Sequence, residues 1–329
     1  MSGKLRIGVL GAARIVPTAL LAPARVVEDV EIASIAARDP ERARRFARRH
    51  GIAGVAESYE ALVSDPSLHA IYNPLPNTLH ALWSIRALEA GKHLLCEKPF
   101  TSNEAEARLV ADAAKRSGRV AMEAFHWRYH PLADRMRAVV ASGELGRVKR
   151  IERAMCVPLP LPGNIRYRLE LGGGAAMDTG CYAVSMMRHL ASAEPRVGRV
   201  EVRLSSPDVD RWMRAEVAFD DGRTGRVICS IFSATLLSIR ARVEGEDGTM
   251  DVLNPIAPHV VTNRLTLTTK SGRRSEKVPG EPTYTGQLRA FAGAVLRGEP
   301  VPTDAEDAVK NMRVIDDLYR GAGLPLRGT

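Results

Sequence analysis

The segment Gly91-Lys92-His93-Leu94-Leu95-Cys96-Glu97-Lys98-Pro99 indicates a buried β-strand that ends in two opposite charges and a proline. A Gly-containing turn precedes the apolar run 94–96, as expected for a parallel strand covered on both faces. Charges are costly inside a sheet, but at the carboxyl end of a strand they project into the crevice where open α/β sheets bind ligands. Pro99 restricts Lys98 to extended backbone angles. The alternative is a solvated Glu97–Lys98 pair that simply closes the strand.

A possible nucleotide-binding turn lies near the N-terminus. The strand pattern 5–10 runs into Gly11-Ala12-Ala13-Arg14-Ile15-Val16 and then into a helical pattern. In such a strand–turn–helix unit the backbone N–H groups hold a dinucleotide pyrophosphate. The glycine fingerprint is degenerate, because Ala13 and Val16 stand at its second and third glycine positions. Taken alone, this motif is a weak signal.

The second strand, 31–37, ends in Ala37-Arg38-Asp39-Pro40, and its tip bears on the choice of cofactor. An acid at this position accepts a hydrogen bond from the ribose 2′-hydroxyl of NAD, whereas an arginine can pair with the 2′-phosphate of NADP. Arg38 comes first, and Asp39 is expected to cap a helix that begins at Pro40. The order favours NADP. In the alternative, Arg38 is merely exposed and Asp39 serves the ribose of NAD.

A stiff loop follows the next predicted strand, 70–72. Two prolines hold Asn73-Pro74-Leu75-Pro76-Asn77, which suits a wall against a cofactor, and Asn77 could cap the helix 78–90. His80 lies in the first turn of this helix and could equally be an ordinary surface residue. A helix over 103–117 and a strand over 120–125 complete the alternation. Residues 1–125 are therefore predicted to form a doubly wound parallel α/β sheet.

The pattern changes after Phe125, and residues 126–329 are predicted to form a second, α+β domain. Its strands are long and alternate in hydrophobicity, with turns between them that favour an antiparallel sheet. The expected strands are 148–157, 199–205, 211–219, 225–233, 238–244 and 265–270, followed by helices 285–296 and 304–319.

A glycine-rich segment, Leu171-Gly172-Gly173-Gly174-Ala175-Ala176-Met177-Asp178-Thr179-Gly180-Cys181-Tyr182, interrupts this sheet. The glycines permit backbone angles that other residues avoid and a close approach to a ligand. The helix expected after them places Asp178 and Tyr182 four residues apart on one face. With a cation nearby, a carboxylate and a phenol in this arrangement form a plausible proton-transfer unit. Without one, the favoured interpretation is structural: an acid in a first helical turn and a half-buried tyrosine.

The composition narrows the classes of function. A chain of 329 residues with 45% hydrophobic and 26% charged residues predicts a soluble protein of two domains. The net charge of +9 would suit a nucleic-acid binder, but aromatic residues are only 5% and no basic run is interleaved with them. The four cysteines lack metal-ligand spacing, so neither a metal site nor a disulfide framework is expected. No apolar run reaches membrane-spanning length, and a cytoplasmic location is expected.

Taken together, the motifs Gly11 to Ile15, Pro74 to His80, Gly91 to Pro99 and Gly172 to Tyr182 resemble the glucose–fructose oxidoreductase / inositol dehydrogenase / rhizopine-catabolism (Gfo/Idh/MocA) family. Their order and spacing match over essentially the whole chain. The segments 122–128 and 164–166 resemble the branch that contains aldose (xylose) dehydrogenases and dihydrodiol dehydrogenases. His126, where many relatives have Met, and Tyr167-Arg168-Leu169, which replaces a common Leu-Asp-Pro, depart from the pattern and leave the identity of the sugar open.

The resemblance implies an N-terminal Rossmann domain, a C-terminal domain with a large open sheet, and a homodimer or dimer of dimers formed through that sheet. It implies hydride transfer between NADP, or NAD, and a carbohydrate-like substrate or related polyol or diol. Lys98, Tyr182 and Asp178 are the expected catalytic residues. The expected cofactor contacts are Gly11, Ala12, Ala13, Arg14, Ile15, Ala37, Arg38, Pro74, Leu75, Asn77, His80, Glu97 and Lys98. The expected substrate contacts are Phe125, Arg128, Asn164, Arg166, Asp178 and Tyr182. The alternative is a non-catalytic NAD(P)-binding sensor, since the family includes such proteins; it would not need the three catalytic residues.

Overall fold

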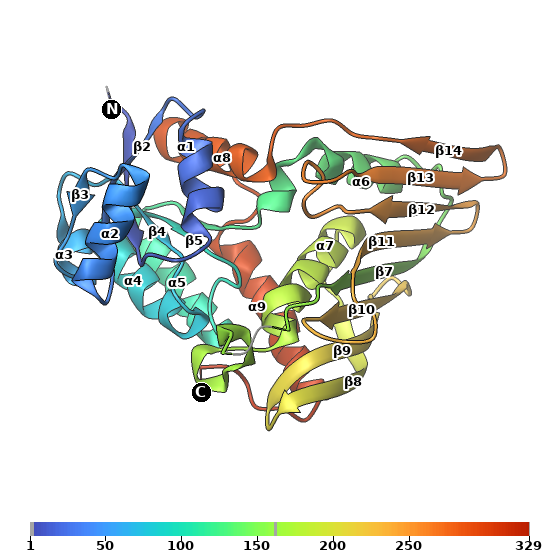
Figure 1. The fold of residues 1–329 in the computed structure, drawn as a ribbon. Helices are drawn as coiled ribbons and strands as arrows, with labels where there is room; N and C mark the ends of the chain where they lie inside the picture. The colour runs from blue at the N-terminus through green and yellow to red at the C-terminus, as the bar shows by residue number, and fades with distance from the viewer. Residues whose placement is uncertain (1–2, 161–162, 329) are drawn as a thin grey trace. The chain divides into compact units, whose positions relative to one another are not determined.

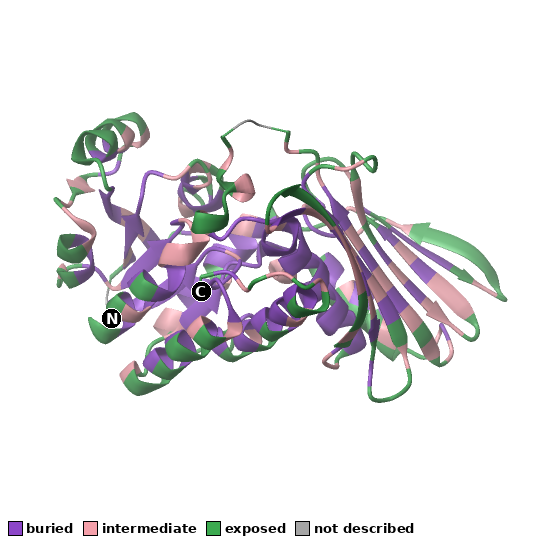
Figure 2. Ribbon diagram, turned by 90° about the horizontal axis from the view of Figure 1, so that it is seen from below, coloured by how far each residue is buried: buried purple, intermediate pink, exposed green. Residues whose placement is uncertain are grey.

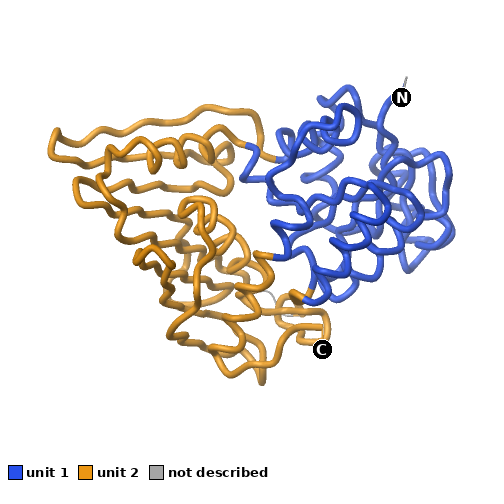
Figure 3. The backbone as a smooth tube through the Cα atoms, turned by 180° about the vertical axis from the view of Figure 1, so that it is seen from behind, with its two compact units in different colours: residues 1–101, 105–129, 284–309 blue, residues 102–104, 130–283, 310–329 orange. Residues whose placement is uncertain are grey.

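The computed structural model describes residues 3–160 and 163–328, which form two compact units. Unit 1 comprises the residues up to Thr101, Ala105–Tyr129 and Tyr284–Val309 (Figure 3). Unit 2 comprises Ser102–Glu104, His130–Thr283 and the residues from Lys310 onward. The sequence predicted a boundary after residue 125, with everything beyond it in the second domain; the structure instead groups Tyr284–Val309 with unit 1.

Unit 1 is built on a six-stranded parallel sheet in the order β3-β2-β1-β4-β5-β6. The strands are β1 (Leu5–Leu10), β2 (Val30–Ala36), β3 (Gly54–Val55), β4 (Ala70–Asn73), β5 (His93–Cys96) and β6 (Ala121–Glu123). The helices are α1 (Ala22–Ala24), α2 (Pro40–His50), α3 (Tyr59–Ser64), α4 (His80–Glu89), α5 (Glu104–Ser117) and α8 (Thr283–Arg297). The predicted doubly wound sheet is confirmed.

Both faces of this sheet are buried, because the side chains of β1 alternate between two apolar clusters. Leu5, Ile7 and Val9 pack in one cluster, which also holds Phe291 of α8. Leu10 packs in the other, beneath α3 and α4. The contact with Phe291 explains why α8 belongs to unit 1: this late helix buries its apolar face against the parallel sheet rather than in the second domain.

Unit 2 contains an eight-stranded, mostly antiparallel sheet in the order β14-β13-β12-β11-β7-β10-β9-β8, in which only β7 and β10 pair in parallel (Figure 1). The strands are β7 (Val148–Cys156), β8 (Arg196–Ser206), β9 (Val209–Ala218), β10 (Thr224–Ser230), β11 (Ser238–Gly245), β12 (Gly248–Leu253), β13 (Arg264–Thr269) and β14 (Gly272–Glu276). The helices are α6 (Pro131–Ala141) and α7 (Cys181–Ala191), and α9 (Ala305–Gly321) ends in this unit.

The strands of the large sheet carry different side chains on their two faces. Along β7 the buried residues Ile151, Arg153 and Met155 alternate with half-buried Arg150, Glu152 and Ala154. Helix α7 is fully buried and packs against β7 and β10 (Figure 2). β12 and β14 were not predicted. β14 is an edge strand of polar residues that are exposed at four of its five positions. It therefore lacks the alternation of apolar and polar residues from which a strand is predicted.

Candidate functional site

The turn after β1 has the geometry of a tight, ligand-approaching loop. Gly11 has a φ of +90°, a conformation that favours glycine, and its N–H donates to Ala36 O (2.7 Å). A Cβ at Gly11 would lie 3.1 Å from the Leu75 side chain and 3.8 Å from the Tyr59 hydroxyl. Ala12 is buried, Ala13 and Ile15 are half-buried, and Arg14 is exposed. The helix that follows begins with a π-helical turn, Pro17–Leu21.

Three side chains gather at the tip of β2, beside this turn. The Tyr59 hydroxyl accepts from the backbone N–H of Arg38 (3.2 Å), and Arg42 Nη2 donates to Ala12 O (2.8 Å). Burial raises the pKa of Tyr59, while the hydrogen bond from Arg38 N–H and the charges of Arg38 and Arg42 act to lower it. The predicted N-cap is confirmed, since Asp39 accepts from Glu41 N (3.0 Å) at the start of α2.

Neither Arg42 nor Tyr59 was predicted from the sequence as part of this site. Arg42 lies in the first turn of α2, so it could have been found by asking which α2 residues face the β1 turn. Tyr59 comes from α3 and meets Arg38 only through the tertiary fold, so the sequence offered no comparable signal.

The predicted stiff loop is held from behind by two buried polar side chains. Asn73 Nδ2 donates to His80 O and to the Ser84 hydroxyl, each at 3.1 Å. The His80 ring nitrogens lie 2.8 Å from Pro99 O and 2.7 Å from Leu75 O, and burial lowers the pKa of His80 to about 4. A neutral imidazole has a single N–H, so His80 donates to one of these two carbonyl oxygens and packs against the other. His80 is 1% exposed between the two loops, which corrects the alternative of a surface residue.

Asn77 does not cap a long helix as predicted. A 3-10 turn, Asn77–Leu79, comes first, and α4 begins only at His80, with Leu79 at its N-cap. Pro74 and Leu75 are buried, and Asn77 is half-buried.

The charged end of β5 is more ordered than a solvated ion pair. Glu97 is 9% exposed, and its Oε1 accepts from the Tyr72 hydroxyl at 2.6 Å. Burial and the neighbouring carboxylate of Glu97 raise the pKa of Tyr72 well above its usual value, and the same two causes raise the pKa of Tyr284. Lys98, which precedes a cis peptide bond to Pro99, is half-buried. Its positive charge contributes to the lowered pKa of His80.

Two of the predicted substrate contacts lie in unit 1, in different environments. Phe125 is completely buried, so its side chain presents no surface to a ligand in unit 1. Arg128 is half-buried, with its guanidinium 5.5 Å from the centre of the Trp127 ring. His126, one of the departures from the family pattern, stacks on Tyr284 with ring centres 4.2 Å apart. Tyr72 and Tyr284 were not predicted from the sequence as neighbours of Glu97.

In unit 2 the structure brings together Asn164, Arg166, Asp178 and Tyr182. Arg166 Nε lies 2.7 Å from Asp178 Oδ2, and Asn164 Oδ1 accepts from Arg166 N at 3.1 Å. Burial acts to lower the pKa of Arg166, but the charges of Asp178 and Tyr182 outweigh it and raise that pKa. The cation required beside the acid and the phenol is thus present within unit 2. Tyr182 is 5% exposed, and the side chain of Asp178 is 14% exposed.

The helix that carries these residues does not start as predicted. A π-helical turn, Ala176–Gly180, precedes α7, so Asp178 lies in the π-helical turn and Tyr182 in the α-helix. The regular spacing of an α-helix therefore does not place Asp178 and Tyr182 on one face. Arg166, which interacts with both, is the evidence that the two side chains lie close together.

The residues of unit 1 fit a phosphorylated dinucleotide. The β1 turn provides a close backbone approach at Gly11, and two arginines flank it at the position of the adenosine ribose. Within residues 3–160 and 163–328, no group of three or more His, Cys, Asp or Glu side chains could hold a metal ion. None of the helices in these ranges is both long and apolar enough to cross a membrane.

Comparisons with known proteins agree with this geometry. Residues 5–125 match the model of an oxidoreductase family with an NAD-binding Rossmann fold, and residues 133–251 match the GFO/IDH/MocA C-terminal domain. The chain is 38% identical to D-xylose 1-dehydrogenase (NADP(+)) 2 of Haloferax volcanii, over 96% of both chains. It is 30% identical to dTDP-3,4-didehydro-2,6-dideoxy-alpha-D-glucose 3-reductase of Actinomadura kijaniata, over 97% of this chain and 96% of that protein.

Among solved structures, the chain resembles KijD10, a 3-ketoreductase from Actinomadura kijaniata in complex with NADP and TDP-benzene. The TM-score is 0.90 at 27% identity, over 97% of this chain and 98% of that one.

Proposed function

The chain belongs to the GFO/IDH/MocA family of oxidoreductases, and from this premise we propose that it is an NADP-dependent enzyme acting on sugars or related polyols and diols. It transfers a hydride between nicotinamide and a carbon of the substrate. The observation that carries the proposal is the group formed by Arg166, Asp178 and Tyr182, because a phenol, a carboxylate and a guanidinium supply what proton transfer at a sugar hydroxyl needs.

The cofactor, when bound, supplies or accepts the hydride. The backbone of the turn from Gly11 to Ile15 would hold its pyrophosphate, and Ala37 borders its ribose. Arg38 and Arg42 would pair with its 2′-phosphate. The wall beside the nicotinamide would come from Pro74, Leu75, Asn77 and Glu97. The His80 ring lies between Leu75 O of this wall and Pro99 O.

Tyr182 exchanges a proton with the reacting oxygen of the substrate. A phenol has an ordinary pKa near ~10, so it needs a neighbouring cation to react at neutral pH. Arg166 provides this cation within unit 2. Lys98, the catalytic lysine that the family resemblance implies, would stabilise charge on the reacting oxygen. Asp178, oriented by Arg166, accepts from a neighbouring hydroxyl and so aligns the reacting carbon. Asn164 and Arg128 bind further hydroxyls.

A screen of substrates tests this proposal. NADPH formation is measured with D-xylose, other aldoses and diols, and NADPH consumption with keto-sugars, each repeated with the NAD pair. We expect turnover of at least one sugar or diol, with NADP preferred. NADPH binding without turnover of any compound would instead favour a non-catalytic NAD(P)-binding protein.

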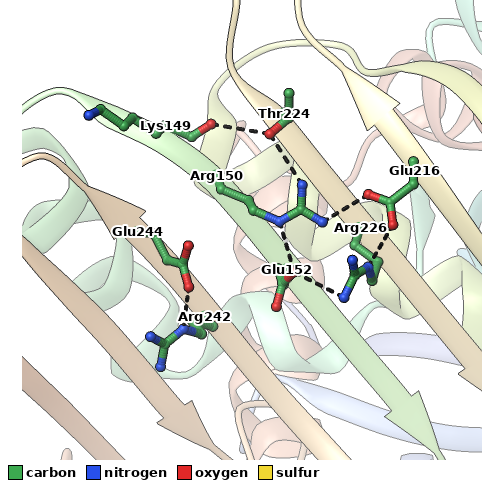
Figure 4. A network of polar contacts seen from close by, with 8 residues as sticks. All are labelled: Lys149, Arg150, Glu152, Glu216, Thr224, Arg226, Arg242 and Glu244. Carbon is green, nitrogen blue, oxygen red and sulfur yellow. Dashed lines mark hydrogen bonds and ion pairs between the residues drawn. The ribbon is translucent and has the colours of Figure 1, made fainter.

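We further propose that unit 2 also serves assembly, as a homodimer or a dimer of dimers through the large sheet. The supporting feature is an array of paired charges on the face of β7, β9, β10 and β11 (Figure 4). Arg150 bridges Glu152 and Glu216 (2.8 Å each), and Arg226 pairs with the same two glutamates. A face with both signs of charge in register can be self-complementary about a two-fold axis.

The molar mass in solution tests the assembly. We expect at least twice the mass of the chain, and a smaller mass for the charge reversal Glu216→Arg. A wild-type protein that stays monomeric at micromolar concentration would refute this part of the proposal.

A further inference from the structure

Unit 2 contains a fully buried polar network outside the group described above. Asp210 of β9, Tyr319 of α9 and Arg327 near the C-terminus are each 0–1% exposed. Asp210 Oδ1 accepts from the Tyr319 hydroxyl and from Arg327 Nη2, both at 3.0 Å. The Arg327 guanidinium also lies 4.0 Å from the centre of the Tyr319 ring.

This network hydrogen-bonds the backbone of the glycine-rich segment on both sides of Gly174. Asp210 Oδ2 accepts from Ala176 N (2.7 Å), and Arg327 Nε donates to Gly173 O (2.8 Å). Gly174 has a φ of +137°, and a Cβ there would lie 2.6 Å from the Tyr319 hydroxyl and closer still to Asp210. A glycine is therefore required, because the network occupies the space of a side chain.

The backbone of this segment also fixes the positions of Arg166 and Asp178, two members of the proton-transfer group. Gly174 O accepts from Asp178 N (3.1 Å), which fixes the start of the π-helical turn that leads to Tyr182. On the other side, Gly174 N donates to Arg166 O (2.9 Å), so the same glycine also fixes the backbone at Arg166. Both partners of the Arg166–Asp178 ion pair are thus attached to a single glycine.

The composition of the network suggests more than a contribution to stability. Burial raises the pKa of Asp210 even though Ala176 N–H, Arg327 and the Tyr319 hydroxyl all act to lower it, so the carboxylate is costly to bury. Apolar residues of similar volume often stabilise a protein as well as a buried ion pair does. A directional network, in contrast, holds a backbone in one conformation.

Resting on the proposed function, we propose that Asp210, Tyr319 and Arg327 are positioning residues, which orient Asp178, Arg166 and Tyr182 toward the substrate by fixing the backbone at Gly173–Ala176. None of the three touches the substrate. They act through the N–H of Ala176 and the carbonyl of Gly173.

The test uses the full-length variant Tyr319→Phe, which removes one hydroxyl and keeps the ring. Tyr129→Phe is the matched control, because the Tyr129 hydroxyl makes a comparable hydrogen bond to Thr303 Oγ1 (2.7 Å) in unit 1. Hydrogen–deuterium exchange is followed over residues 172–182 of the ligand-free proteins. Steady-state kinetics and the Kd of NADPH are measured in parallel.

For Tyr319→Phe we expect faster exchange over 172–182 and a kcat lower by about ten- to a hundredfold, since small misplacements of reacting groups have effects of this size. The Kd of NADPH should stay within about twofold of the wild-type value, because the residues that would hold it are in unit 1. Tyr129→Phe should change neither the exchange over 172–182 nor kcat.

Wild-type kcat and KM in Tyr319→Phe would overturn the positioning role, whether or not the exchange changes. Should the wild-type protein turn over no sugar or diol, the proposed function fails. In that case the exchange measurement still decides whether the network holds this segment, and unchanged exchange would refute it.

Discussion

Replacing Arg38 or Arg42 by Ala should reveal how the protein selects between NADPH and NADH. The 2′-phosphate carries a charge of about −1.5 to −2 at neutral pH, and a hydrogen bond to a charged group contributes about 1.5–3 kcal/mol. Loss of one guanidinium should therefore raise the Kd of NADPH by about 10- to 150-fold. NADH lacks the phosphate, so Arg38→Ala should leave its Kd nearly unchanged.

Arg42 should behave differently, because its Nη2 already donates to Ala12 O at 2.8 Å. Its removal loosens the β1 turn as well, and a lost hydrogen bond of about 0.5–1.5 kcal/mol would weaken both cofactors by about two- to twelvefold. Arg42→Ala should thus show a loss common to both cofactors and an additional loss for NADPH alone.

Equilibrium titration of NADPH and NADH fluorescence gives both dissociation constants for each variant. Arg48→Ala is the matched control: it lies exposed in the last turn of the same helix and removes the same charge. Equal losses for NADPH and NADH in Arg38→Ala, or a loss of the same size in Arg48→Ala, would refute recognition of the 2′-phosphate by these residues.

Two further predictions concern stability. Arg153 in β7 is 1% exposed and donates to Arg240 O, but its Nε and Nη2 lack hydrogen-bond partners within the described residues, and burial lowers its pKa to about 9. Arg153→Met should therefore raise the free energy of unfolding in urea by about 1–4 kcal/mol, and a decrease would show that the charge is compensated. Burial raises the pKa of Asp316 from 3.8 to about 6, so the native state binds the proton more tightly than the unfolded state, and stability is lost as pH rises from about 4 through 6. A rise of this size corresponds to at most about 3 kcal/mol, and to less with partial solvent screening, so Asp316→Asn should be about 1–3 kcal/mol more stable than wild type at pH 8 but not at pH 4. A pH-independent difference in thermal unfolding would contradict this assignment.

The sequence was sufficient for features set by local patterns. Asp39 was recognised as an N-cap because its position before Pro40 is a local signal. The parallel sheet followed from strands that alternate with helices. Asp178 and Tyr182 were proposed as a pair from their spacing, and Asn164 and Arg166 from the family resemblance; the structure places Arg166 against Asp178.

Features that depend on tertiary contacts could not be predicted in this way. His80 is buried between two loops, although its place in a first helical turn also suits a surface residue. Arg327 lies 117 residues from Asp210 along the chain, and nothing in its local sequence marks it as buried. The π-helical turn at Ala176–Gly180 shows no distinct periodicity over five residues.

The most direct test of the central claim is the kcat of Lys98→Ala with the sugar or diol that the wild-type protein turns over best, measured at saturating NADP. We predict that turnover falls by at least about a thousandfold, while the Kd of NADPH stays within about threefold of the wild-type value. A kcat close to that of the wild-type protein would contradict the account, because it would remove Lys98 from the chemistry.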